Sequence, residues 1–153
     1  MDTSETAQIR KLGIVGHAAE KFTPETETLA RRAMYDFAVM GHPHLEAIVS
    51  GHSPMGGIDW WAEELAEVLG VEMIIHAPLG NSWGEPGGYR DRNLRIAEDS
   101  DRVLCVVVKE LPPEFEGMRF AGCYHCKGRN PQHVKSGGCW TAWRCKRQAW
   151  RII

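Results

Sequence analysis

The regular alternation of short apolar runs with longer amphipathic segments is the feature that most constrains the fold. Five short apolar runs predict strands, at residues 11–17, 45–51, 71–78, 101–110 and 151–153. Four segments in which apolar residues recur at helical spacing predict helices, at residues 23–41, 58–70, 89–100 and 139–150. Repeated β-α units build a mostly parallel sheet with helices on both faces. We therefore expect an α/β fold with three layers, α/β/α, around a mostly parallel five-stranded sheet.

Residues typical of helix ends flank the first two predicted helices. Thr23 suits the N-cap and Pro24 the first helical position. Gly70 is typical of a residue that closes a helix. Four apolar residues recur at helical spacing along the first predicted helix: Leu29, Ala33, Phe37 and Met40.

Length and composition indicate one globular domain. The chain has 153 residues, of which 43% are hydrophobic and 25% charged, and this excludes a disordered or fibrous chain. We expect residues 1–10 to be a flexible N-terminal tail and residues 11–153 to form the domain. The segment 111–138 is long and rich in glycine and proline, so we expect it to be functional or internally cross-linked.

Charge and cysteine content narrow the classes of partner. The formal net charge is −2, so no overall basic field attracts nucleic acid. Basic residues gather in 144–151, where we expect the solvated face of the last helix; a phosphate-contacting patch is the alternative. No apolar run is long enough to span a membrane, and the polar N-terminus is unlike a signal peptide. Together with an odd number of cysteines, five, this favours a cytoplasmic protein with free or metal-bound thiols.

Small residues cluster in the loops that follow the predicted strands. These loops are 16–22, 50–59, 80–93 and 136–138, and neither a G-x-G-x-x-G fingerprint nor a Walker loop is present. In an open α/β sheet ligands bind beyond the carboxyl ends of the strands, and glycine lets backbone N–H groups approach an anion. Gly16 and His17 stand at this edge after the first strand. Each glycine pair could instead be a turn that lets a helix pack on the sheet.

Three segments together carry a resemblance to a known superfamily. They are "VSGHSPMGGIDWWAEELAEVLG", "YRDRNLRIAEDSDRVLCVVV" and "SGGCWTAW". Over residues 11–153 the chain resembles the SLOG superfamily, which includes the Lonely Guy phosphoribohydrolases. The resemblance implies a Rossmann-like domain that binds a nucleotide or a nucleotide-derived ligand. Some members cleave or transfer at an N-glycosidic bond and others act as sensors, and this class of fold often forms homodimers through helix faces.

The resemblance implies further ligand-binding residues in each loop. They match its glycine-rich turn, the arginine neighbourhood of its third helix and its phosphate loop: Ser50, Gly51, Gly56, Gly57, Arg90, Arg92, Asn93, Ser136, Gly137, Gly138 and Thr141. Ser136 and Trp140 differ from the Lonely Guy phosphate-loop motif. Arg144 stands where those enzymes carry a catalytic glutamate, and arginine cannot replace a carboxylate that stabilises an oxocarbenium-like centre.

Carboxylates and aromatic rings near these loops are candidates for chemistry and stacking. Asp59 and Glu20 are the proposed catalytic carboxylates, although Asp59 is also typical of a helix N-terminus. Trp83 and Trp140 flank glycine loops and would either stack on a base or pack in the core.

The cysteines and a histidine have the spacing of a metal site. Cys123, Cys126, His133 and Cys139 form a C-x2-C-x6-H-x5-C pattern, a full tetrahedral ligand set for Zn²⁺ within the loop 111–139. The alternatives are free or redox thiols, or a ligand set in which His125 or Cys145 takes part. A complete set of four favours a structural zinc over a catalytic one, which would keep a position open for water.

These features together predict a nucleotide-binding protein. The expected partner is a nucleotide or nucleotide-derived small molecule, bound at the carboxyl ends of the strands beside a loop closed by structural zinc. One alternative is a hydrolase or transferase acting at a nucleoside or nucleotide N-glycosidic bond. The other is a non-catalytic sensor or sequestering protein for a nucleotide.

Overall fold

The structure is a computed structural model that describes residues 8–129 and 132–153. Its strands are β1 Lys11–Gly16, β2 Ala47–Ser50, β3 Glu72–Ile75, β4 Arg102–Val107 and β5 Gln148–Ile152. They form one five-stranded sheet in the order β3-β2-β1-β4-β5, and every neighbouring pair is parallel. The predicted parallel sheet is therefore confirmed.

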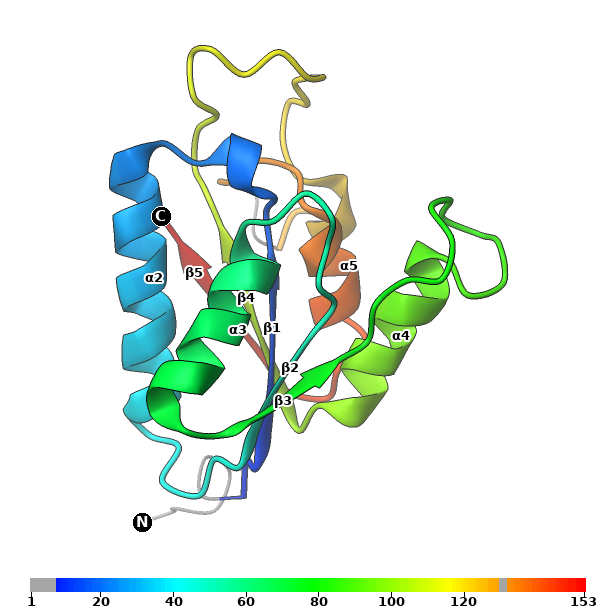
Figure 1. The fold of residues 1–153 in the computed structure, drawn as a ribbon. Coiled ribbons are helices and arrows are strands. Elements are labelled where there is room, and N and C mark those ends of the chain that lie inside the picture. Colours follow the sequence, from blue (N-terminus) through cyan, green and yellow to red (C-terminus); the bar gives the residue numbers. More distant parts are fainter. Residues whose placement is uncertain (1–7, 130–131) are drawn as a thin grey trace.

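Helices cover both faces of this sheet. The α-helices are α2 Pro24–Val39, α3 Ile58–Leu69, α4 Tyr89–Asp99 and α5 Gly137–Ala142, and the short 3-10 helices are η1 Ala19–Lys21 and η2 Tyr124–Cys126. Figure 1 shows α2 and α3 on one side of the sheet and α4 and α5 on the other. The fold is the predicted three-layer α/β/α arrangement, with the strand order of a Rossmann-like sheet. No helix in the described part of the chain has the length and apolar character needed to cross a membrane.

The ends of the first two helices are as predicted, and of the four apolar residues at helical spacing in the first predicted helix Phe37 is the one that is buried. Thr23 caps α2 by a reciprocal pair of hydrogen bonds with Thr26, and Gly70 closes α3 in the left-handed conformation. Leu29 and Met40 are 55% and 72% exposed. The buried face consists instead of Ala30, Met34, Phe37 and Ala38, the residues that recur every three or four positions toward the sheet.

The last predicted helix is wrong in its second half. Helix α5 ends at Ala142, and residues 148–152 form strand β5, which pairs with β4 from Val103↔Gln148 to Val107↔Ile152. The basic residues of 144–151 therefore lie in a connection and an edge strand, not along a helix. The reason is tertiary: β4 offers an unpaired edge, and parallel pairing gives the backbone of 148–152 its hydrogen bonds.

The two faces of the sheet bury different cores. Alternation along β4 sends Leu104 and Val106 toward α2 and α3, and Val103, Cys105 and Val107 toward α4 and α5. Ile9, which the sequence placed in the flexible tail, is fully buried in the first core. The rest of the predicted tail, residues 1–7, lies outside the described residues.

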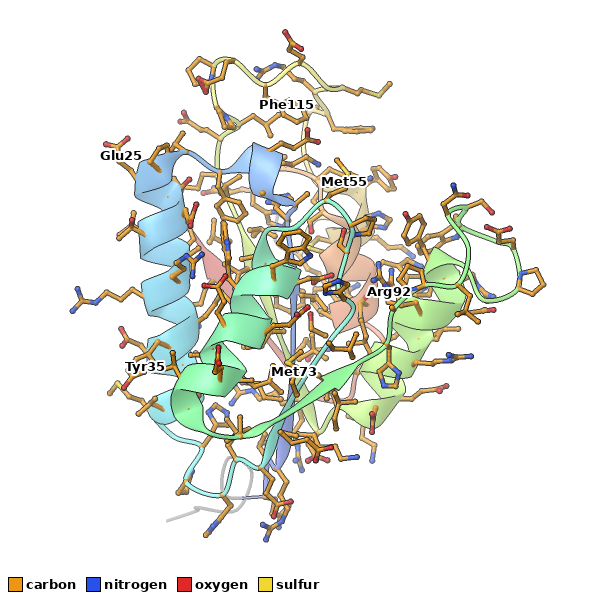
Figure 2. All side chains as sticks on the ribbon, viewed as in Figure 1. Glu25, Tyr35, Met55, Met73, Arg92 and Phe115 are labelled. Atoms are coloured by element: carbon orange, nitrogen blue, oxygen red, sulfur yellow. The ribbon has the colours of Figure 1, made fainter. Side chains whose placement is uncertain are left out.

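The strand order places a crevice at one edge of the sheet. Strands β1 and β4 are neighbours, and the connections that follow them run to opposite sides, which makes their carboxyl ends the topological switch point. The segment after β4, which contains Phe115, projects beyond this edge in Figures 1 and 2.

Candidate metal centre and ligand cavity

The four predicted metal ligands come together on the α4 and α5 side of the sheet. The ligand atoms of Cys123, Cys126, His133 and Cys139 all lie within 4.8 Å of one another, and all four residues are buried. They come from three places in the chain: the turn around η2, the segment before α5, and the first turns of α5 itself. The predicted spacing therefore does produce a cluster that could hold a metal ion.

Two of the distances within the cluster match a tetrahedral ion with sulfur and nitrogen ligands, and the widest separation, up to 4.8 Å, is larger. The Nε2 atom of His133 lies 3.4 Å from the Sγ of Cys126 and 3.8 Å from the Sγ of Cys139. Ordinary Zn–S and Zn–N bond lengths imply edges of about 3.5–3.8 Å in such a tetrahedron. The Nδ1 atom of His133 lies 2.7 Å from the carbonyl oxygen of Val134, to which it donates, so Nε2 is the free ligand atom.

Two tryptophans direct N–H groups toward the sulfurs. Trp150 Nε1 donates to the Sγ of Cys139 at 3.4 Å, and the rings of Trp150 and Trp143 lie 4.4 Å apart. Trp143 Nε1 is buried and has no hydrogen bond of ordinary geometry among the described residues. Burial raises the pKa of Cys126 to about 12, and the indole of Trp143 acts in the opposite direction. Both indoles thus favour negatively charged sulfur.

The alternative ligands lie outside the cluster. The Sγ of Cys145 donates to the carbonyl oxygen of Ser100 at 3.4 Å. His125 lines the neighbouring cavity. Cys105 is fully buried in β4, with its Sγ 3.8 Å from that of Cys139. All five cysteines are free.

His17 joins the end of β1 to the segment that carries the metal ligands. Its Nδ1 accepts from the backbone N–H of Val108 at 3.2 Å, so its Nε2 carries the proton that it donates to the carbonyl oxygen of Lys135 at 2.9 Å. Burial lowers the pKa of His17 to about 4, so this neutral form holds at neutral pH. His17 therefore fixes Lys135 relative to the sheet.

A cavity of about 610 Å³ opens at the switch point, beside the metal cluster. Its floor is the end of β1 and the start of α5, and its walls come from α3, α4, the loop before α4 and the turn around η2. The lining residues are Val15, Gly16, Ala18, Ser53, Asp59, Trp83, Tyr89, Arg92, Asn93, Ile96, Tyr124, His125, Lys135, Gly137, Gly138, Trp140 and Thr141. A volume of this size suits a small-molecule ligand.

Aromatic rings and cations share the walls of this cavity. Trp83 and Trp140 meet edge to face with ring centres 4.8 Å apart, and the guanidinium of Arg144 lies 3.6 Å from the centre of the Trp140 ring. Lys135 Nζ lies 5.5 Å from the centre of the Tyr124 ring. Such walls can stack on a planar group and neutralise an anion.

Asp59 is held in a network at the first turn of α3. Its carboxylate accepts from the Ser50 hydroxyl at 3.1 Å and from the Ser53 N–H at 2.9 Å. Arg92 reaches across from α4 (Figure 2), donates to the carbonyl of Gly51, and places its NH1 3.9 Å from Asp59. Burial raises the pKa of Asp59, against the opposing charge of Arg92. The pair lines the cavity but is already engaged within the protein.

The structure brings only some of the predicted site residues to the cavity. Those that line it are Gly16, Asp59, Arg92, Asn93, Gly137, Gly138 and Thr141. Those that do not are Glu20, His17, Ser50, Gly51, Gly56, Gly57, Arg90 and Ser136. Glu20 is exposed, and the Ser136 hydroxyl instead accepts from the Gly138 N–H as the cap of α5.

Two of the predicted glycines are required by packing. A side chain at Gly57, where φ is +77°, would meet the backbone of His17 and Ala19 at 2.4 and 2.5 Å. A side chain at Gly138 would lie 2.9 Å from the Gly16 nitrogen. These glycines let α3 and α5 approach β1, whereas the Cα of Gly137 faces open space.

The sequence reasoning missed the residues that the long loop contributes to the cavity. Tyr124, His125 and Lys135 all line it, as does Tyr89 at the start of α4. Tyr124 and His125 stand inside the C-x-x-C motif, so their position beside two metal ligands was a usable signal. Lys135, in contrast, reaches the cavity only because of how the loop closes.

Comparisons of the chain with protein-family models, with curated proteins and with solved structures find no match. The fold and site define an α/β protein with a Rossmann-like sheet and a buried cluster of three cysteines and one histidine. A cavity at the carboxyl ends of the strands lies beside this cluster.

Proposed function

We propose that the protein binds a nucleotide or a nucleotide-derived small molecule in the switch-point cavity. The observation that carries the proposal is the combination of stacking surfaces and cations at this position of the sheet, with Trp83 and Trp140 beside Lys135 and Arg92. A planar base suits the aromatic wall, and a phosphate suits the cationic one. The resemblance to the SLOG superfamily supports the same class of ligand.

We further propose that the cysteine and histidine cluster holds a structural zinc ion. Three sulfurs and one imidazole nitrogen within 4.8 Å of one another are a ligand set that suits zinc. Since four ligands complete the coordination, no position remains for substrate or water. The ion would supply a fixed positive centre that orders residues 111–139, from which Tyr124, His125 and Lys135 reach the cavity.

An enzyme acting at an N-glycosidic bond is the second candidate function, and Asp59 favours it. Asp59 is a cavity-lining carboxylate whose pKa burial raises, as in many acid and base catalysts. Against it, Arg144 occupies the place of the Lonely Guy glutamate and donates to the carbonyl of Trp140. Binding of a nucleotide therefore remains the leading proposal, and the loss of the glutamate favours the sensor or sequestering alternative over the enzyme.

Calorimetry against nucleosides and nucleotides tests the binding proposal. Gly137→Val is the sharpest variant, because a side chain there enters open space at the cavity and meets no neighbour. It should weaken binding at least about tenfold, or about 1.4 kcal/mol, while Arg32→Ala, on the exposed face of α2, should leave binding unchanged. Unchanged affinity in Gly137→Val would place the ligand elsewhere.

Two further measurements separate the remaining parts of the proposal. Elemental analysis of protein purified without added metal should find about one zinc per chain. Chromatography of each bound nucleotide after long incubation should show no free base if the protein only binds. Base release that disappears in Asp59→Asn would support the enzyme instead.

A further inference from the structure

The charges around the cavity are unbalanced, and the imbalance constrains the ligand. Among the lining residues Asp59 is the one acidic side chain, and Arg92 stands beside it. Lys135 then remains as a lining cation without a carboxylate partner among the described residues, beside His125, whose pKa is lowered by burial and by the charge of Lys135. The cavity therefore presents net positive charge on the wall that the metal-binding loop provides.

Two exposed arginines lie beside this wall, although neither lines the cavity itself. Arg144 lies flat on Trp140, whose ring lines the cavity, and it makes no ion pair within the described chain. Burial, and after it the charge of Arg90, lowers the pKa of Arg144, so the two guanidinium groups lie within electrostatic reach. Arg90 follows the lining residue Tyr89 and likewise has no acidic partner in the described chain.

Lys135 is half-buried and the two arginines are exposed, so water screens the repulsion between these like charges only in part, and a bound anion would relieve it. A single phosphate neutralises one or two of them. The aromatic wall adjoins the same group, because the Trp140 ring meets Trp83 on the cavity side and carries Arg144. Since a single phosphate balances at most two of the three cations, one ligand can meet both features only if it joins a planar ring to more than two negative charges.

We infer that the ligand is a nucleotide with two or more phosphates, whose base lies against Trp83 and Trp140 and whose phosphates lie toward Lys135, His125 and Arg144. The inference rests on the proposed nucleotide function and narrows its ligand class. It assigns the phosphates to the wall of the metal-binding loop, not to Arg92, which Gly51 and Asp59 already engage.

A matched series tests this inference: adenosine, AMP, ADP and ATP, and the same four forms of guanosine, titrated at constant ionic strength with zinc content checked afterwards. Affinity should rise about tenfold or more from the monophosphate to the diphosphate or triphosphate of the preferred base. Lys135→Met and Arg144→Met should remove most of that rise and leave the affinity for the nucleoside within about threefold. Arg32→Met is the matched control and should keep the full rise.

The outcomes are distinguishable. A monophosphate that binds as tightly as the diphosphate and triphosphate would overturn the inference and leave the proposed nucleotide function standing. A short single-stranded oligonucleotide that binds more tightly than every mononucleotide would overturn it in favour of a nucleic-acid end. Failure of every form, nucleosides included, would overturn both.

Discussion

The two faces of the sheet are stabilised in different ways. Toward α2 and α3 the core is aliphatic and aromatic, with Ile14, Met34 and Ile48 almost fully buried. Toward α4 and α5 it contains all five cysteines, and α5 has only six residues. The first face can be held by apolar burial alone. The second has too little regular structure for that, and the proposed metal replaces it.

The same difference separates the face that mainly stabilises the fold from the face that carries the cavity. The cavity opens where the metal-binding loop meets the carboxyl ends of β1 and β4, and the first core contributes little to its lining. The cavity wall that we propose binds the ligand is thus built from the segment that we propose the ion orders. Each prediction below changes one side of this comparison and leaves the other as its control.

Removing a metal ligand should have the largest effect. Cys126→Ser should reduce the affinity for zinc well beyond the 10–100-fold typical of removing a group that hydrogen-bonds to a metal ligand, because it deletes a direct bond to the metal. Hydrogen exchange should then accelerate across 111–139 far more than in β1 and β2. Cys145→Ser, a buried cysteine outside the cluster, should retain the metal. Equal loss of protection across the whole sheet would contradict the division into two regions.

Neighbouring residues of β2 offer a matched test of the two cores. Ile48 faces the first core and Val49 the second, and both are fully buried. Ile48→Ala should lower the free energy of unfolding by about 2–5 kcal/mol, with or without zinc. Val49→Ala should destabilise the zinc-bound protein, but much less the zinc-free protein, whose second core is already loosened. Urea unfolding with and without a chelator measures both; identical zinc dependence of the two variants would defeat the comparison.

Acid should weaken the connection between the regions at His17. Its pKa is lowered to about 4 in the folded protein, whereas the unfolded value is near 6.5. The unfolded chain therefore binds the proton first, so this stability is complete above about pH 6.5 and is lost as the pH falls toward 4. The slope is about 1.4 kcal/mol per pH unit, about 3 kcal/mol in all.

The matched variants are His17→Gln and His44→Gln, the latter at an exposed histidine. Urea unfolding between pH 4.5 and 7 gives the slope of the free energy of unfolding against pH, which counts the protons taken up on unfolding. His17→Gln should reduce this count by up to one proton, and His44→Gln should leave it unchanged. A slope unchanged by His17→Gln would mean that zinc loss, and not His17, governs the acid sensitivity.

The smallest expected effect concerns the indole donors. Trp150→Phe keeps the ring but removes the N–H group that donates to Cys139, and it should weaken zinc binding by about 10–100-fold, or about 1.4–2.7 kcal/mol. In the cobalt-substituted protein the sulfur-to-metal charge-transfer band should also shift to lower energy. Trp61→Phe, in the opposite core, should change neither. An unshifted band in Trp150→Phe would reduce Trp150 to a packing residue.

The regular parts of the fold could be predicted from the sequence because local signals and burial agree there. Thr23 and Gly70 mark helix ends by their own chemistry, and β1, β2 and β4 are buried on both faces, so they are apolar without alternation. In residues 148–152 the local sequence signals do not agree with the observed structure. Their state is decided by the open edge of β4, a long-range partner that local periodicity does not reveal.

The cysteine and histidine cluster could be predicted because its residues are close in sequence, whereas the cavity could not because its residues are far apart. Cys123, Cys126, His133 and Cys139 lie close in sequence, and the chemistry of the ion dictates their spacing. The cavity instead joins residues from β1 to α5, and the direction of each side chain follows from the closed loop. Arg90 shows the limit: it shares a helix with Arg92, yet Arg92 lines the cavity and Arg90 does not.

The central claim is that the metal centre orders the ligand wall, and nucleotide affinity with and without zinc tests it most directly. The measurement pairs two titrations of the tightest-binding nucleotide, on zinc-bound protein and on zinc-free protein whose sheet remains folded by circular dichroism. Ordering the loop only when ligand arrives opposes binding by on the order of 1 kcal/mol per residue immobilised. Zinc removal should therefore weaken affinity by about 5–150-fold, and nucleotide should tighten zinc binding by the same factor. Equal affinities in the two titrations would mean that the cluster and the cavity are only neighbours.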